Sequence, residues 1–257
     1  MYRYVYGSRI HRTWNRYSLI NTYNFSIEYL LIEFFFFLSG FIPYSSIYDS
    51  KYDTHGYIGY RESDHTIYVV YRGSSDIKNW VNNIEVALTD YPYCNGCSVH
   101  NGWYKAMGKV IDQVFVDVSS LVLKFPTFKI LVTGHSLGAA LSTLTFAELK
   151  TMYTDIEVYT FGSPRVGNTE FSTWFGKQFS TFYRITHHKD MVPHVPMHER
   201  YTHIGGEWYH ESNVDASDLH SCEDEPEDPS CSYQWMMTSI DDHLLYFGIS
   251  TSCPDNS

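Results

Sequence analysis

One serine stands in a pattern that could make it a nucleophile. Ser136 is the central residue of Gly-His-Ser-Leu-Gly over residues 134–138. The aliphatic run 130–133 precedes this segment and the Ala- and Leu-rich run 139–149 follows it, which predicts a buried strand that turns sharply into a helix. Flanking glycines permit a tight turn, and the first amides of the helix favour negative charge beside the serine. The pattern therefore predicts a catalytic serine, with an incidental serine in a glycine-rich turn as the alternative.

A serine hydroxyl needs a base, and the base needs an acid that holds its tautomer. Asp190 follows the predicted strand 182–186 within a short loop, so it should lie at the same sheet edge as Ser136. His243 comes after the last core elements, and the chain order Ser, Asp, His is the one expected for this kind of turn. The competing histidines, which capping, core or surface roles would also explain, are His194, His198 and His203.

An acyl-transfer site also needs donors for the oxyanion of its tetrahedral intermediate. The backbone N–H of Leu137 is one candidate, because Leu137 follows the nucleophile. Ser74, in the loop after the predicted strand 66–71, is the second. Capping of the next helix is the alternative role for Ser74.

An apolar stripe follows that loop. Ile77, Trp80, Val81, Ile84 and Leu88 recur at helical spacing. So short a helix is marginal in water and must pack on something. Because the stripe begins beside the proposed oxyanion loop, we predict a hinged lid over an apolar acyl cleft. A helix packed permanently on the core is the alternative.

The remaining pattern predicts the elements that must position these residues. Strands and helices alternate, which indicates an α/β fold with a mostly parallel central sheet and helices on both faces. Ligands bind such sheets beyond the carboxyl ends of the strands, where the proposed site residues fall. The predicted strands are 66–71, 128–133, 156–161 and 182–186, and the predicted helices are 102–125, 139–149 and 171–179.

Composition narrows the ligand classes. The chain has 257 residues, 44% of them hydrophobic, and a formal net charge of −11. This charge disfavours nucleic acid and simple electrostatic attraction to anionic membranes. His187, His188 and His194 lack the paired spacing of a zinc helix, so we expect no metal site.

The five cysteines fit an exported protein. Cys94 and Cys97 form one close pair, and Cys222 and Cys231 flank an acidic loop. A zinc site would need more ligands at matched spacing, so local disulfides Cys94–Cys97 and Cys222–Cys231 are the better interpretation. Cys253 is then left over.

Residues 1–50 differ from the rest. Four arginines precede an apolar run over 29–42, as in a targeting sequence. A membrane anchor, a core element of the domain and an atypical N-terminus are the alternatives. We adopt a targeting segment over 1–50 and a catalytic domain over 51–257, which predicts a secreted or endomembrane-lumen protein with an N-terminal anchor as the alternative.

In its motifs the chain resembles lipase class 3, the filamentous-fungal type. The resemblance implies an α/β-hydrolase fold, a triad of Ser136, Asp190 and His243, and a lid around residues 76–84. It also implies an oxyanion hole from Ser74 and Leu137, and no metal or organic cofactor. The matching segments run in family order: 69–75, 77–80, 132–138, 159–168, 190–196 and 242–248.

The resemblance carries further implications and two departures. The Cys222–Cys231 spacing matches a family disulfide. Residues 1–50 contain no cysteine to pair with Cys253, and the N-terminal helix of the family is not recognisable. Positions that line the family's acyl groove are matched by Val192, Val195, Pro196 and Leu244.

The implied substrate is an acylglycerol at a lipid–water interface, hydrolysed by a triacylglycerol lipase without an obligate protein partner. Cys94 and Cys97 followed by Val99 and His100 resemble instead the feruloyl esterases of the same family, which favours aryl esters of plant polysaccharide. The apolar stripe decides our preference for a lipase. A non-catalytic lipid-binding relative is the third alternative, but such relatives typically lose triad residues.

Overall fold

The computed structural model describes residues 40–212, 216–222 and 226–251. Most of the proposed targeting segment, residues 1–39, lies outside the described residues, and so does Cys253. No helix in the described part of the chain is long and apolar enough to cross a membrane.

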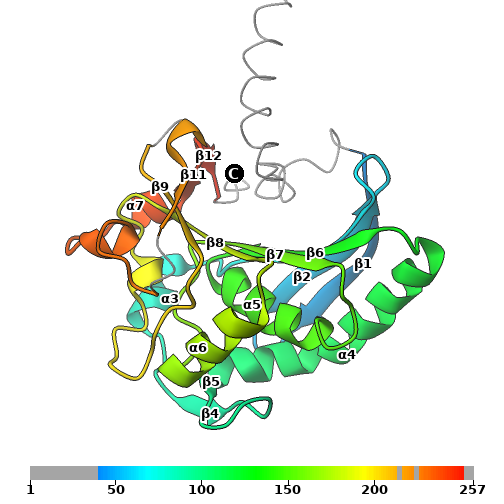
Figure 1. Ribbon diagram of the computed structural model, residues 1–257, viewed down its shortest axis with the longest axis horizontal. Coiled ribbons are helices and arrows are strands. Elements are labelled where there is room, and N and C mark those ends of the chain that lie inside the picture. Colours follow the sequence, from blue (N-terminus) through cyan, green and yellow to red (C-terminus); the bar gives the residue numbers. More distant parts are fainter. Residues whose placement is uncertain (1–39, 213–215, 223–225, 252–257) are drawn as a thin grey trace, which may run out of the picture.

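The core of the molecule is an eight-stranded sheet (Figure 1). Its five central strands, from β3 to β9 in spatial order, are parallel, while β1, β2 and β10 run antiparallel to their neighbours. This confirms the mostly parallel sheet. In spatial order the strands are β1 (Phe41–Asp49), β2 (Thr54–Arg61), β3 (Thr66–Tyr71), β6 (Lys129–His135), β7 (Ile156–Phe161), β8 (Phe182–His187), β9 (Glu207–His210) and β10 (His220–Ser221).

Three longer helices cover one face of this sheet, α4 (Asn101–Lys124), α5 (Leu137–Leu149) and α6 (Thr169–Gln178) (Figure 1). Nearly every residue of α5 is buried, so this helix lies between the sheet and its neighbours. In the described residues the opposite face is covered by aromatic side chains of the C-terminal segment, Tyr246 and Phe247, rather than by a long helix. We expected helices on both faces, whereas among the described residues the long helices lie on one face.

The sheet begins earlier than the boundary we placed at residue 51. Strand β1 starts at Phe41, inside the apolar run over 29–42, and pairs along its length with β2. The Phe41 ring packs edge-on against Tyr57 and Tyr68, at centroid distances of 5.6 and 5.9 Å. The end of the run is therefore a core strand, because its aromatic residue completes one face of the sheet.

Short elements connect and follow the long ones. The proposed lid is shorter than its stripe predicted, because α3 ends at Asn82 and Leu88 opens a strand paired with His100. Ile84 lies in the connection between them. These short elements are α3 (Ile77–Asn82), β4 (Leu88–Asp90), β5 (Ser98–His100), η1 (Val192–His194), η2 (Ala216–Asp218), η3 (Ser232–Gln234), α7 (Ile240–His243), β11 (Leu245–Tyr246) and β12 (Ile249–Ser250).

Candidate active site

Ser136 lies between β6 and α5 in a strained backbone conformation, with φ 61° and ψ −127°. Its N–H donates to the Phe161 carbonyl at 3.0 Å. A Cβ on Gly134 would lie 2.4 Å from the Gly138 carbonyl oxygen, and one on Gly138 would lie 2.3 Å from the Tyr71 carbonyl oxygen. Both glycines are therefore required by close backbone approach, and the turn they allow pushes the serine out of the regular helix.

Asp190 and His243 form a fully buried pair. The Nδ1 atom of His243 lies 2.9 Å from each carboxylate oxygen of Asp190. The carboxylate also accepts the Tyr246 hydroxyl at 2.6 Å and the Val192 N–H at 2.8 Å. Burial acts to raise the pKa of Asp190, but the charge of His243 and these hydrogen bonds hold it below its ordinary value. The carboxylate is thus kept ionised against the imidazole.

The loop after β7 packs directly on this pair. Gly162 has φ 54°, and a Cβ there would lie 2.7 Å from Asp190 Oδ2 and 2.9 Å from His243 Nδ1. Sequence reasoning assigned no role to Gly162 and used its segment only for the family resemblance. A glycine directly after a parallel strand, at the edge that carries the site, was the signal that could have found it.

His135 packs against His243 and hydrogen-bonds to its backbone. Its Nε2–H donates to the His243 carbonyl at 2.9 Å, and the two rings stack with centroids 4.2 Å apart. Burial, with a smaller effect from His243, lowers the pKa of His135 to about 3. The ring therefore stays neutral and acts as a hydrogen-bond donor. The sequence pattern around Ser136 predicts no role for His135.

The other histidines of the Asp190 loop hold the segment that carries His243. His187 Nδ1 lies 2.9 Å from the Asp242 carbonyl oxygen, and His188 Nδ1 lies 2.9 Å from the Asp242 carboxylate. Ser239 caps α7 by accepting the Asp242 N–H at 3.1 Å. One ring nitrogen of each of these two histidines thus binds the segment that carries His243.

The two atoms that would exchange a proton in the predicted triad have no hydrogen-bond partner within the part of the chain that the structure describes. Ser136 Oγ and His243 Nε2 are both buried, and neither has a hydrogen-bond partner among the described residues. Every other polar atom of the Asp190–His243 pair is engaged. A buried hydroxyl and imidazole nitrogen without partners are available to each other and to a bound ester.

The loop proposed for the oxyanion hole lies beside the serine. A Cβ on Gly73 would come within 3.1 Å of Ser136 Cβ. Leu137 is the first residue of α5, where a backbone N–H has no partner within the helix. Helix α3 is capped by Asp76, which accepts the Asn79 N–H at 3.1 Å. The capping alternative for Ser74 is thereby removed, since another residue fills that role.

The stripe of the proposed lid packs on the proposed acyl groove and, through Trp80 and Ile84, also on the main core. Val81, Val192 and Val195 form one buried cluster, and four partly buried apolar side chains pack against it. Pro196 is buried and Leu244 is half-buried, but neither belongs to this cluster. The four partly buried side chains that pack against the valine cluster are Ile77, Trp80, Ile84 and Met191. Lid and groove positions, predicted separately, therefore meet.

The rival histidines have other contacts, and none of them hydrogen-bonds to Asp190. His203 donates to the Pro193 carbonyl, and His198 Nδ1 accepts the Arg200 N–H at 3.1 Å. The half-buried His194 ring lies parallel to Tyr233. These contacts are structural and agree with the capping, core or surface roles considered for these histidines.

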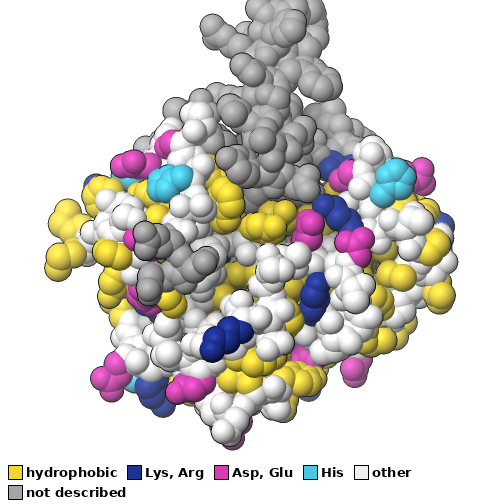
Figure 2. All heavy atoms as spheres, in the orientation of Figure 1, with side chains coloured by type: hydrophobic (Ala, Val, Ile, Leu, Met, Phe, Trp, Pro, Cys, Tyr) yellow, Lys and Arg dark blue, Asp and Glu magenta, His cyan; other side chains and the backbone are white. Residues whose placement is uncertain are grey.

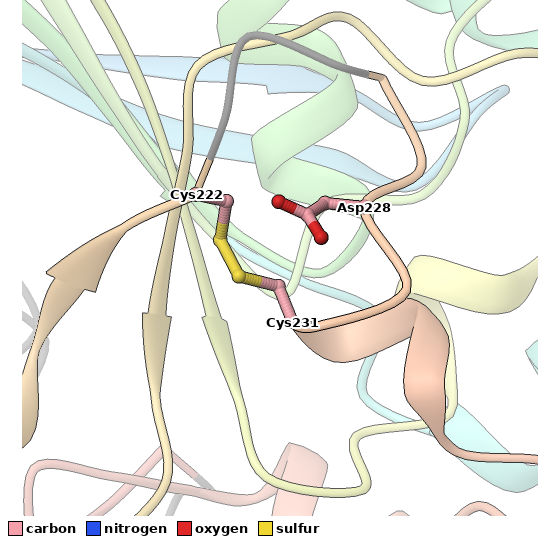
Figure 3. A group of neighbouring side chains, drawn as sticks. All are labelled: Cys222, Asp228 and Cys231. Carbon is pink, nitrogen blue, oxygen red and sulfur yellow. A yellow bond between two sulfur atoms is a disulfide. The ribbon is translucent and has the colours of Figure 1, made fainter.

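Both predicted disulfides are present, Cys94–Cys97 and Cys222–Cys231. Among the described residues, the one group with metal-ligand spacing is Cys222, Asp228 and Cys231. Figure 3 shows that the two sulfur atoms of this group are bonded to each other. The pair therefore closes the acidic loop and leaves no thiolate for a metal ion.

Known proteins resemble the chain in sequence. The family profile described as "Lipase (class 3)" matches residues 68–200. The lipase of Rhizomucor miehei is 33% identical over 207 residues, which are 78% of this chain and 57% of that protein. Secreted mono- and diacylglycerol lipase 1 of Fusarium solani is 36% identical over 155 residues, 60% of this chain and 46% of that protein. The chain thus spans about half the length of these curated relatives.

Solved structures agree with this likeness. The lipase of Rhizopus microsporus var. chinensis superposes with a TM-score of 0.77 at 32% identity, over 82% of this chain and 75% of that one. A triacylglycerol lipase whose catalytic centre is described as a serine protease triad gives a TM-score of 0.75 at 32% identity, over 82% of each chain. The α/β-hydrolase fold expected from the sequence is therefore confirmed.

Proposed function

The chain belongs to the class 3 lipase family, and we propose that it is a triacylglycerol lipase that acts through Ser136, His243 and Asp190. One observation carries the proposal. The buried Asp190–His243 pair stacks on His135, the neighbour of the strained Ser136, and both atoms needed for proton transfer, Ser136 Oγ and His243 Nε2, lack a hydrogen-bond partner among the described residues.

The proposed reaction follows from these atoms. Ser136 Oγ attacks the ester carbonyl carbon while its proton passes to His243 Nε2, and the carbonyl π electrons move onto the oxygen. The N–H of Leu137 and the donors of Ser74 stabilise that oxyanion. The intermediate collapses, the alkoxide leaves with the proton from His243, and an acyl-serine remains. Water then repeats the steps and releases a fatty acid.

Asp190 acts on this cycle through His243. Its carboxylate fixes the tautomer with Nδ1 protonated, so that Nε2 can accept the serine proton. It also stabilises the imidazolium formed after that transfer. The lowered pKa of Asp190 suits this role, because the carboxylate must remain charged while the imidazole gains and loses its proton.

The apolar cluster beneath the lid supports a long-chain acyl substrate. Val81 packs against Val192 and Val195, and an acyl chain could replace these contacts once the helix moves away. The signal for an aryl esterase is weaker in its structural context. Both ring nitrogens of His100 are engaged, one with the Glu85 carbonyl at 2.8 Å and one with the Trp103 N–H at 3.3 Å. His100 therefore has a structural role that accounts for it.

Secretion is part of the proposal. The two disulfides suit an oxidising compartment. The relatives from Fusarium solani and Penicillium cyclopium are named as secreted lipases.

A substrate panel tests the function. We expect the purified protein to hydrolyse a triolein emulsion at least about tenfold faster than methyl ferulate at equal ester concentration. Ser136→Ala should lower the triolein rate by about 10⁴-fold or more. Ser120→Ala, which changes a serine on α4, should keep the parental rate. A higher rate on methyl ferulate, or a triolein rate unchanged by Ser136→Ala, would contradict the proposal.

A further inference from the structure

Four large apolar side chains are exposed beside the proposed acyl groove. Met236 is 100% exposed, Met237 79%, Met197 74% and Tyr233 50%. We call these residues the methionine rim. Exposed apolar side chains that gather in one place mark a surface that another apolar phase covers. We therefore expect another apolar surface to cover the methionine rim.

The rim adjoins the lid through one short turn. Val192, in the 3₁₀ turn η1, packs against the lid cluster, while His194 in the same turn lies parallel to the Tyr233 ring at 6.4 Å. Met197 follows two residues after Val195 of that cluster. In Figure 1 the segment that carries η3 projects from the side of the molecule where α3 lies, and Figure 2 shows hydrophobic side chains at this projecting edge.

The segment that carries the methionine rim is anchored to the rest of the protein. Between Tyr233 and Met236, the Trp235 side chain turns inward and donates from Nε1 to the Tyr209 hydroxyl at 2.9 Å. The Lys189 ammonium lies over the Trp235 ring at 4.7 Å. The disulfide at Cys231 closes the preceding loop. Two methionines held outward on an anchored segment do not reach the core of the chain, and their flexible side chains adapt to a fluid apolar surface.

The charges near the rim favour a neutral surface. Met197, Tyr233 and Met236 border a cavity of about 730 Å³ with Arg165 and Glu227 in its lining. The Arg165 guanidinium pairs with Glu227 at 2.7 Å and also donates to backbone carbonyls. Together with Lys189 over the Trp235 ring and Glu199 in the cavity lining, the formal charges of these four groups sum to zero. The chain as a whole carries −11. Anionic lipid headgroups would be repelled rather than drawn to such a surface.

We propose that the methionine rim is a docking surface that inserts into an electrically neutral lipid–water surface, independently of the lid. The proposal rests on the proposed function, because a lipase must remain at a surface while its acyl groove takes up substrate. Insertion of Met236 and Met237 would place the turn η1, and with it the groove residues Val192 and Val195, against the lipid. Docking would then precede lid opening.

The test measures binding without hydrolysis. The full chain carrying Ser136→Ala is mixed with triolein droplets coated with phosphatidylcholine, and the bound fraction is measured after flotation. Adding Met236→Ser and Met237→Ser together should weaken droplet binding at least about tenfold, because two methionine side chains lose their apolar burial. The matched control is Met152→Ser. Met152 is 64% exposed in the connection from α5 to β7, at the opposite edge of the sheet.

The same rim substitutions with Ser136 intact should leave the rate on a soluble acetate ester unchanged, which shows that the variant folds. Equal droplet binding by the double variant and the Met152→Ser control would overturn the proposal. So would binding that requires anionic phosphatidylglycerol, or a self-association that the double variant abolishes without any change in droplet binding. Failure of the proposed function would appear separately, as a parent enzyme that does not hydrolyse triolein.

A second measurement detects insertion directly and does not require a variant with weaker droplet binding. Met236→Trp should shift the tryptophan emission to shorter wavelength when droplets are added, relative to the change seen in the parent chain. Met152→Trp should add no such shift. Equal behaviour of these two variants would also overturn the docking surface.

Discussion

The Asp190–His243 pair and the lid helix α3 lie at the same edge of the sheet but are held by different kinds of contact. The pair is fixed by directional hydrogen bonds from Tyr246, Val192 and His135. Among the described residues, the hydrogen bonds of α3 (Ile77–Asn82) stay within residues 76–83, and its tertiary contacts are apolar. Apolar contacts are not directional, so another apolar surface can replace them. We therefore propose that the pair stays in place and that the contacts of α3 can be exchanged.

The largest test of the fixed region is Asp190→Asn. The amide cannot hold the Nδ1–H tautomer of His243, so we expect a loss of about 10⁴-fold in kcat on a soluble ester. Asp155→Asn, on an exposed aspartate just before β7, should have no effect. Retention of more than a tenth of the activity by Asp190→Asn would mean that another group orients the base.

Gly162→Ala should have the next largest effect. A methyl group there would overlap Asp190 Oδ2 and the His243 ring, and the backbone has φ 54°. We expect a loss of about a hundredfold in kcat, because a small displacement of the pair is costly. Gly108→Ala provides the control, since a Cβ at Gly108 meets nothing within 4 Å. Full activity in the Gly162→Ala variant would show that the pair tolerates displacement.

Tyr246→Phe removes one hydrogen bond from the fixed region. We expect about a tenfold loss in kcat/KM, because Asp190 loses one of the hydrogen bonds that hold it against His243, and we expect the pKa of Asp190 to rise toward its ordinary value of 3.8. A carboxylate with a lowered pKa contributes stability above its ordinary pKa that is lost as the pH falls through the folded value. The variant should lose less stability over that acidic range. Tyr48→Phe, at an exposed tyrosine of β1, is the control, and an unchanged acid-induced loss of stability in Tyr246→Phe would argue against this role of Tyr246.

The smallest effect is expected in the exchangeable region and has the opposite sign. Val81→Ser weakens the packing of α3 on Val192 and Val195, so the open state gains population. We expect the rate on a soluble ester below its solubility limit to increase a few-fold. Val116→Ser, on an exposed valine of α4, should change nothing. A decrease in rate for Val81→Ser would indicate that the helix is a fixed part of the site.

The same contrast separates what the sequence could predict from what it could not. Ser136, Asp190 and His243 could be proposed as a triad because a tight turn, a sheet edge and the order of residues along the chain can be read from local sequence. The roles of His135, Gly162 and Tyr246 depend on which side chains meet across long sequence separations, for example 108 residues between His135 and His243. No periodicity in one segment reports such a contact.

The helix proposed as a lid begins where the apolar stripe begins, but it is shorter than the stripe predicted. The stripe from Ile77 to Leu88 has helical spacing, yet pairing of Leu88 with His100 takes the last position into a strand. Spacing alone could not detect a competing strand partner. The boundary at residue 51 failed for a similar reason, because Phe41 belongs to an apolar run whose partners, Tyr57 and Tyr68, come later in the chain.

The central claim is that Ser136 is the nucleophile of an Asp190-supported histidine. It is tested most directly by treating the full chain with an alkyl phosphonate ester that reacts with activated serines, followed by mass mapping of the labelled peptide. The account predicts one phosphonate per chain, attached to Ser136, with labelling at least about a hundredfold slower in the Asp190→Asn variant. A label on any other serine, or equal labelling rates in the parent and the variant, would contradict it.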